Sequence, residues 1–150
     1  MARAISIEDL YVHISANQKE CVESAAEHIA QLIGHQPHAR ISFASGQTLI
    51  PMYEQLALKI KRDEINCSQI ECFQLAEYYP CSSKQPFSFT KYLRDYVVRP
   101  LFLSEAQCHF IDGEAGDPEA EAKSFDLLLH DIDLHILGVG PGGHVGFDEA

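Results

Sequence analysis

The segment at the end of the sequence combines a run of glycines with side chains that exchange protons. Residues 138–143 read Gly-Val-Gly-Pro-Gly-Gly, His144 follows directly, and Asp148 and Glu149 come shortly after. An imidazole titrates near neutral pH, with an unperturbed pKa of about 6.5. Glycines permit positive φ angles and a close backbone approach. The spacing predicts an imidazole and carboxylates gathered on one loop; the alternative is a plain glycine turn.

Residues 138–143 also satisfy the pattern G-x-G-x-x-G of dinucleotide-binding loops. That fingerprint must open a helix inside a βαβ unit, and it needs an acidic residue about 20 positions later. Residues 144–150 leave no room for this helix and acid within the sequence, and Pro141 removes a backbone donor from the loop. We therefore do not expect this loop to bind a nucleotide.

A second loop with suitable chemistry is Ser45-Gly46-Gln47-Thr48, between a short strand-like segment and a helical one. Backbone N–H groups and hydroxyls before a helix bind anions, helped by the helix dipole. No lysine follows the glycine, so the loop is not a Walker loop. Phosphate binding and ordinary helix capping are both compatible with it.

The hydrophobic spacing predicts strands that alternate with helices. We expect Ser15 and Gly34 to bound the first helix, Asp117 to cap the last, and Pro100 to interrupt the third. The alternation favours an α/β fold: a single three-layer α/β/α domain over residues 1–150, with a mostly parallel, Rossmann-like sheet and helices on both faces. Ligands then bind at the carboxyl ends of the strands. The predicted helices are 15–33, 50–62, 89–103 and 118–129, and the predicted strands are 40–44, 70–75, 108–111 and 133–139.

The composition excludes several classes of partner. Lys and Arg number 11 against 22 Asp and Glu, a net charge of −11, so nucleic acids and anionic membranes are poor partners. No apolar run approaches the roughly 20 residues of a membrane-spanning helix. The histidines show no metal-ligand spacing, so we expect no metal. Five cysteines without a C-x-x-C pair favour free thiols and a cytoplasmic location.

Several segments together resemble the glucosamine-6-phosphate deaminase group of the sugar-phosphate isomerase, deaminase and 6-phosphogluconolactonase superfamily. Residues 138–149 (GVGPGGHVGFDE) are similar to the family's G-[VI]-G-x-D-G-H-[IV]-A-F-N-E, and residues 73–78 (FQLAEY) to its F-N-M-D-E-Y. Residues 45–48 stand where the family carries a Gly-Thr-rich phosphate loop, and residues 110–125 resemble its L-x-G-N-A segment and the helix after it. The lactonases share the glycines and the Gly-His pair, whereas the Phe-x-Glu ending and the Glu-Tyr pair favour the deaminase branch.

The resemblance implies conversion of glucosamine 6-phosphate to fructose 6-phosphate and ammonia, a step of amino-sugar metabolism that uses no cofactor. Such a reaction needs an acid–base group for ring opening, a carboxylate base between C2 and C1, and an anchor for the phosphate. Carried over by position, His144 opens the ring and Glu149 is the carboxylate that partners it. The resemblance implies that the phosphorylated amino sugar is bound by Ser45, Gly46, Gln47, Thr48, Gly140 and Gly143.

The sequence departs from the family pattern at two positions that bear on chemistry. Ala76 stands where the family has its proton-transferring aspartate, and Gly142 where it has the aspartate that joins the histidine. Glu77 is not an obvious substitute, because the family already has that glutamate and successive residues at a strand end point to opposite faces. Asp148 replaces an asparagine and is a candidate for partial compensation near His144.

Family chains continue well past the motif, so residues 1–150 correspond to a shortened or partial version. A sheet that lacks strands exposes an edge, and we therefore expect self-association into a homo-oligomer. Three functions remain open: a deaminase; a catalytically impaired homologue that binds a sugar phosphate or another protein; and a 6-phosphogluconolactonase-like hydrolase.

Overall fold

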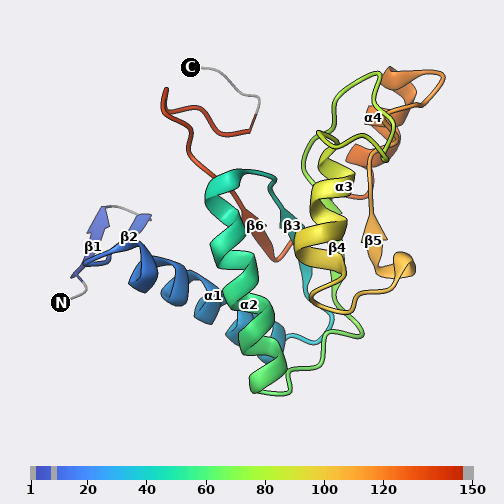
Figure 1. Ribbon diagram of the computed structural model, residues 1–150. Coiled ribbons are helices and arrows are strands. Elements are labelled where there is room, and N and C mark those ends of the chain that lie inside the picture. Colours follow the sequence, from blue (N-terminus) through green and yellow to red (C-terminus); the bar gives the residue numbers. More distant parts are fainter. Residues whose placement is uncertain (1–2, 8–9, 147–150) are drawn as a thin grey trace.

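Four short parallel strands form the central sheet in the order β5-β4-β3-β6, as the computed structural model shows for residues 3–7 and 10–146 (Figure 1). Ile41 pairs with Cys72 on one side and with Leu134 on the other, so the three longest of these strands are in register. The predicted α/β class with a mostly parallel sheet is confirmed. The strands are β3 (Arg40–Phe43), β4 (Glu71–Gln74), β5 (Cys108–His109) and β6 (Leu134–Ile136).

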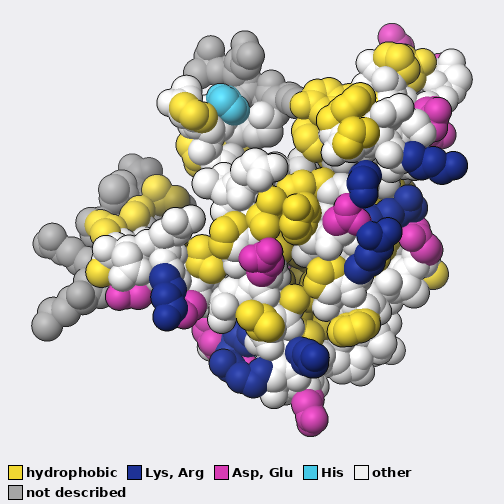
Figure 2. Space-filling model, viewed as in Figure 1, with side chains coloured by type: hydrophobic (Ala, Val, Ile, Leu, Met, Phe, Trp, Pro, Cys, Tyr) yellow, Lys and Arg dark blue, Asp and Glu magenta, His cyan; other side chains and the backbone are white. Residues whose placement is uncertain are grey.

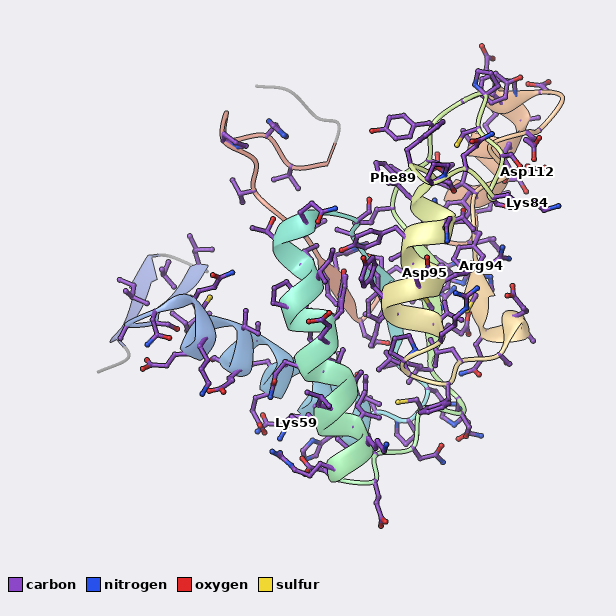
Figure 3. All side chains as sticks on the ribbon, in the orientation of Figure 1. Lys59, Lys84, Phe89, Arg94, Asp95 and Asp112 are labelled. Atoms are coloured by element: carbon purple, nitrogen blue, oxygen red, sulfur yellow. The ribbon has the colours of Figure 1, made fainter. Side chains whose placement is uncertain are left out.

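Three helical segments pack on one face of this sheet: α1 (Gln18–His35), α2 (Ile50–Arg62), and α3 (Phe89–Leu93) with the π-helical turn after it (Arg94–Val98). Successive side chains of a strand point to opposite faces of the sheet. The strand side chains that point toward these helices form one core with the apolar side chains of the helices. Lys59 of α2 reaches Glu27 of α1 at 2.5 Å and Asp63 at 2.9 Å (Figure 3). The core includes Ala26, Ile29, Ile33, Ile41, Phe43, Tyr53, Leu56, Cys72, Leu93 and Val97.

The opposite face of the sheet carries Arg40 and Phe73, with the guanidinium 4.7 Å from the ring centroid. Arg40 also donates to the carbonyls of His130 and Leu128, the latter at 2.7 Å. The segment after α4 (Pro118–Asp126) therefore crosses this second face on its way from β5 to β6. Crossovers between parallel strands are right-handed. The connection from β5 to β6 crosses the sheet in the direction opposite to the connection from β3 to β4, so it must pass over the opposite face. Three helical segments thus cover one face, and the connection through α4 runs over the other.

The first helix differs from its predicted bounds at both ends. Asn17, not Ser15, is the N-cap, and its side chain accepts a hydrogen bond from the Glu20 amide at 3.0 Å. The Glu20 carboxylate bonds back to Asn17 and to the Ala16 amide, a reciprocal arrangement that favours Asn17 over an isolated serine. The helix also runs through Gly34, since one glycine costs only about 1 kcal/mol in a helix.

Other predicted elements exist but are shorter, apart from α2, whose predicted and observed bounds agree. Strand 133–139 is reduced to Leu134–Ile136 because its pairing partner, β3, ends at Phe43. Helix 89–103 ends before Pro100, and α4 ends at Asp126 rather than at Leu129. Strands 40–44, 70–75 and 108–111 also lose residues at their ends.

An antiparallel hairpin precedes the sheet, and the sequence analysis assigned no element there. Its strands, β1 (Arg3–Ile7) and β2 (Leu10–Ile14), pair with each other and lie beside the N-terminal end of α1 in Figure 1. Within residues 3–7 and 10–146, no helix is long and apolar enough to cross a membrane.

Candidate active site

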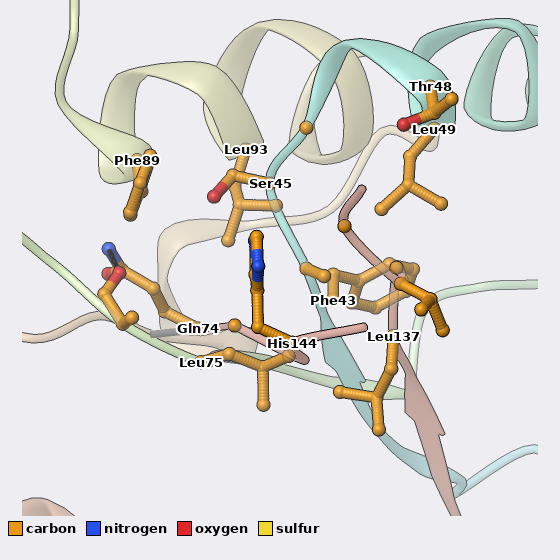
Figure 4. A pocket seen from close by; sticks show the side chains of 17 residues that line it. Phe43, Ser45, Thr48, Leu49, Gln74, Leu75, Phe89, Leu93, Leu137 and His144 are labelled. Carbon is orange, nitrogen blue, oxygen red and sulfur yellow. Dashed lines mark hydrogen bonds between the residues drawn. The ribbon is translucent and has the colours of Figure 1, made fainter. Parts of the chain in front are cut away.

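A cavity of about 250 Å³ opens at the carboxyl ends of β3, β4 and β6 (Figure 4). The segments that follow all three strands supply residues to it. The first loop contributes Ser45, Gly46 and Thr48; the end of β4 contributes Gln74 and Ala76; the C-terminal turn contributes Gly140 and His144. The remaining lining is Phe43, Ala44, Leu49, Leu75, Phe89, Leu93, Leu137, Gly138, Val139 and Gly146.

The C-terminal turn aims His144 into this cavity (Figure 4). The Gly143 amide donates to the Gly140 carbonyl at 3.0 Å, and the Gly140 amide donates to the His144 carbonyl at 2.9 Å. Gly143 has a φ of +82°, which glycine adopts without strain. Val139 and Val145 pair antiparallel on either side and close the turn. Local backbone bonds thus fix the turn from which the imidazole projects.

Two glycines, Gly140 and Gly142, lie next to the His144 imidazole. A Cβ on Gly140 would lie 2.2 Å from His144 Nε2, so the ring occupies the position that any other side chain would need. A Cβ on Gly142 would lie 3.6 Å from His144 Nδ1, in ordinary contact. An aspartate at position 142 would therefore have its carboxylate within reach of the imidazole, and this chain lacks it.

Two tyrosines hold the loop on the other side of the cavity. Tyr53 donates its hydroxyl hydrogen to the Ala44 carbonyl at 2.6 Å, and Tyr92 donates to the Gly46 carbonyl at 2.7 Å. Burial raises the pKa of both phenols, that of Tyr92 to about 12, so both remain neutral donors. A 3₁₀ turn (Gln47–Leu49) then leads directly into α2. The loop thus meets a helix N-terminus, as an anion site requires.

Tyr92→Phe is expected to weaken any binding of inorganic phosphate at this loop about fivefold. The substitution leaves the Gly46 carbonyl without its phenol donor, which costs on the order of 1 kcal/mol and loosens the loop. Titration calorimetry with inorganic phosphate measures the change. Tyr11→Phe, on an exposed tyrosine of β2, is the control, and equal affinities in the two variants would contradict the role of Tyr92.

Glu77 follows Ala76 but takes part in a different structure. Its carboxylate accepts hydrogen bonds from the Ser88 hydroxyl at 2.7 Å and from the Phe89 and Thr90 amides at 3.0 Å, where α3 begins. Partial burial opposes its ionisation, but the bonds from Thr90, Ser88 and Phe89 outweigh it and lower the pKa of Glu77. Glu77 therefore supplies acceptors to the N-terminus of α3, beside the N-cap residue Ser88, and is a weak base.

Gln74 supports the same cap from the end of β4. It is 1% exposed, and its amide group donates to the Ala76 carbonyl at 2.8 Å and to Glu77 at 3.2 Å. Its oxygen accepts from the Thr90 hydroxyl and from the Ile111 amide, both at 3.0 Å. The sequence analysis missed Gln74 and Tyr92; a polar residue at the end of a buried strand was the available signal for the former.

The structure brings most of the predicted site residues together. Ser45, Gly46, Thr48, Gly140 and His144 line one cavity, and the Ala76 position lines it too. The other predicted positions, Gln47, Gly142 and Gly143, lie beside the cavity in the same two loops and are not among its lining residues. Glu149 and Asp148 fall outside the described residues. Among residues 3–7 and 10–146, no cluster of ligating side chains suits a metal ion.

The position of the cavity defines a class of protein. From β3 the chain adds β4 and then β5 on one side, and it afterwards returns to add β6 on the other side of β3. The strand order therefore reverses at β3, where the cavity opens. Open α/β sheets bind small ligands at such a switch point. The chain belongs to the glucosamine-6-phosphate isomerase/6-phosphogluconolactonase family, whose model matches residues 14–146.

Relatives within this family are glucosamine-6-phosphate deaminases by name. That of Halothermothrix orenii is 36% identical over 141 residues, covering 92% of this chain and 58% of its own length. That of Streptomyces avermitilis is 36% identical over 130 residues, covering 85% and 50%. The chain thus spans about half the length of the curated relatives it matches.

Solved structures of the family share the fold. A monomeric glucosamine-6-phosphate deaminase superimposes with a TM-score of 0.84 at 29% identity, over 89% of this chain and 56% of that one. A 6-phosphogluconolactonase from Thermotoga maritima superimposes with a TM-score of 0.71 at 20% identity, over 89% and 60%. The lactonase similarity concerns the fold alone.

Proposed function

We propose that the cavity is a sugar-phosphate site of the deaminase branch, in which deamination is slow. The observation that supports this most is the meeting of His144 and the loop of Ser45, Gly46 and Thr48 in one cavity, in a chain 36% identical to deaminases. The loop and the N-terminus of α2 anchor the phosphate. His144 then lies across the cavity, where it exchanges a proton with the ring oxygen of the sugar.

The slow chemistry follows from the two replaced aspartates. Ala76 lines the cavity with a methyl group, which cannot accept a proton from C2. The carboxylate of Glu77, the next residue, already accepts hydrogen bonds at the N-terminus of α3. Gly142 leaves the Nδ1 side of His144 without the carboxylate that a side chain there would bring. Loss of one general base typically costs on the order of 10²- to 10⁴-fold in rate. Glu149 is proposed to partner His144 in what activity remains.

The test is ammonia release from saturating glucosamine 6-phosphate by the 150-residue chain, beside the Halothermothrix orenii deaminase. We expect a rate lower by roughly 10²- to 10⁴-fold, abolished by His144→Ala and unchanged by His38→Ala, an exposed histidine. Calorimetry on the same samples is expected to show sugar-phosphate binding. A rate equal to that of the relative, or no binding of any sugar phosphate, would overturn the proposal.

A further inference from the structure

Two cysteine side chains lie next to each other on one face of the central sheet. Cys72 of β4 and Cys108 of β5 are register partners in parallel strands, and both are free thiols. Register partners point to the same face of a sheet, and both side chains pack in the core beneath the helices. Neighbouring strands lie about 4.7–4.9 Å apart, within the roughly 4.4–6.8 Å that separates the Cα atoms of a disulfide. The strand pairing therefore places the two sulfur atoms where one bond can join them.

A hydrogen bond already connects the two thiols. Cys108 Sγ donates to the Ser104 carbonyl at 3.3 Å. Because a thiol has one hydrogen, Cys108 is the acceptor in its hydrogen bond with Cys72. This bond raises the pKa of Cys72, which burial raises further, and lowers the pKa of Cys108. Of the two thiols, Cys108 is therefore the one that ionises more readily.

The Cys108 sulfur also lies where a small oxidant can reach it. Cys108 is partly exposed, and β5 is the last strand on its side of the sheet, whereas Cys72 is fully buried. Lys and Arg side chains gather beside α3 in the space-filling view (Figure 2). Among them, Arg94 favours the Cys108 thiolate, although partial burial and the Glu105 carboxylate oppose it. Thiolates, and not thiols, attack peroxides, so the first oxidation falls on Cys108.

We propose that Cys72 and Cys108 form a reversible disulfide when the protein meets a peroxide. The Cys108 thiolate attacks one peroxide oxygen, so that an S–O bond forms, the O–O bond breaks and hydroxide leaves. The Cys72 sulfur then attacks the sulfenic acid on Cys108: the S–S bond forms, the S–O bond breaks, and water leaves with the proton of the Cys72 thiol. The pair of thiols is oxidised by two electrons, and hydrogen peroxide is reduced to water.

The short edge strand makes this step compatible with the fold. β5 meets β4 at only two register positions, so the small shift that brings the sulfurs into bonding distance disturbs little of the sheet. Neither cysteine belongs to the described lining of the cavity, and the proposal therefore does not depend on the proposed function.

Mass spectrometry of the folded 150-residue chain after exposure to dilute hydrogen peroxide tests this proposal. Remaining thiols are capped with N-ethylmaleimide, and peptide mapping identifies the linked cysteines. The expected product has two capped thiols fewer than the five of the reduced chain and a link between Cys72 and Cys108, which dithiothreitol removes. Cys67→Ala, at another buried cysteine, is the matched control and is expected to form the same link at the same rate.

Two further variants test the order of the steps. Cys72→Ala is expected to stop at a sulfenic acid on Cys108, which dimedone traps, and Cys108→Ala is expected to leave Cys72 as a thiol. A link between other cysteines, no link in the folded chain, or a link that forms only in urea would overturn the proposal. Oxidation of Cys72 in Cys108→Ala as fast as in the wild type would overturn it as well. If Cys72→Ala does not fold, the wild type and Cys67→Ala decide.

Discussion

Gly140→Ala is expected to remove the His144 imidazole from the cavity and to reduce any His144-dependent turnover by about 10²-fold or more. The added methyl group would lie 2.2 Å from Nε2 and 2.3 Å from Cε1 of the imidazole, far inside van der Waals contact. The ring is the end of a rotatable side chain, so the conflict is relieved by its rotation and not by the backbone. The free energy of unfolding should therefore change little.

NMR of the imidazole and ammonia release together measure this effect. The expected pattern is an altered His144 resonance and lost turnover at an unchanged melting temperature. Gly116→Ala is the matched control, because its Cβ would meet nothing within 4 Å. An unperturbed His144 resonance in Gly140→Ala would show that the imidazole does not occupy the space above Gly140.

Glu77→Ala is expected to lower the free energy of unfolding by roughly 3 kcal/mol. The substitution removes the acceptor for the Ser88 hydroxyl and for the first two amides of α3, all bonded to a charged group. Hydrogen bonds to charged groups contribute about 1.5–3 kcal/mol, and buried donors left without an acceptor add to the cost. Urea denaturation measures it, and Glu54→Ala, on the exposed face of α2, is the control.

The difference in the free energy of unfolding between the wild type and Glu77→Ala is expected to depend on pH. The folded-state pKa of Glu77 lies below its usual value of 4.5, so its contribution is fully present above that value and is lost as pH falls through the folded pKa. The difference in stability between the wild type and Glu77→Ala should therefore be constant near pH 7 and shrink in acid. A difference that grows as the pH falls would show that Glu77 is not held ionised by its donors.

Gly140 and Glu77 have different roles, one in the cavity and the other in the stability of the fold. Gly140 matters because it has no side chain, and Glu77 matters because its side chain is already occupied. Gly140→Ala should lose turnover and keep its stability, whereas Glu77→Ala should lose stability. That contrast would show that Gly140 serves the cavity and Glu77 serves the fold that supports it.

Local patterns in the sequence predicted several elements well. Helix α2 has its predicted bounds because Tyr53, Leu56 and Ile60 follow one face and Pro51 stands in its first turn. Asp117 caps α4 as predicted, accepting from the Glu119 and Ala120 amides. These signals act within a few residues, so the sequence alone carries them.

Elements that depend on partners were predicted less well. The end of β6 was placed beyond Ile136 because residues 137–139 are apolar, but a strand ends where its neighbour no longer pairs with it. The hairpin of β1 and β2 was not predicted, since its stability comes from the pairing itself. The N-cap at Asn17 was within reach of the sequence, because Glu20 completes a reciprocal cap three residues later.

The sequence by itself determined the order of strands and helices from α1 onward, the glycine-rich turn before His144 and the absence of side-chain oxygens at positions 76 and 142. These are properties of residue types and their spacing. Only the tertiary structure decided that His144 shares one cavity with Ser45, Gly46 and Thr48, that Tyr53 and Tyr92 hold the loop at residues 44–46, and that Glu77 accepts hydrogen bonds from the N-terminus of α3. The physical reason is that these contacts join residues from separate elements, whose meeting depends on how the sheet and helices pack.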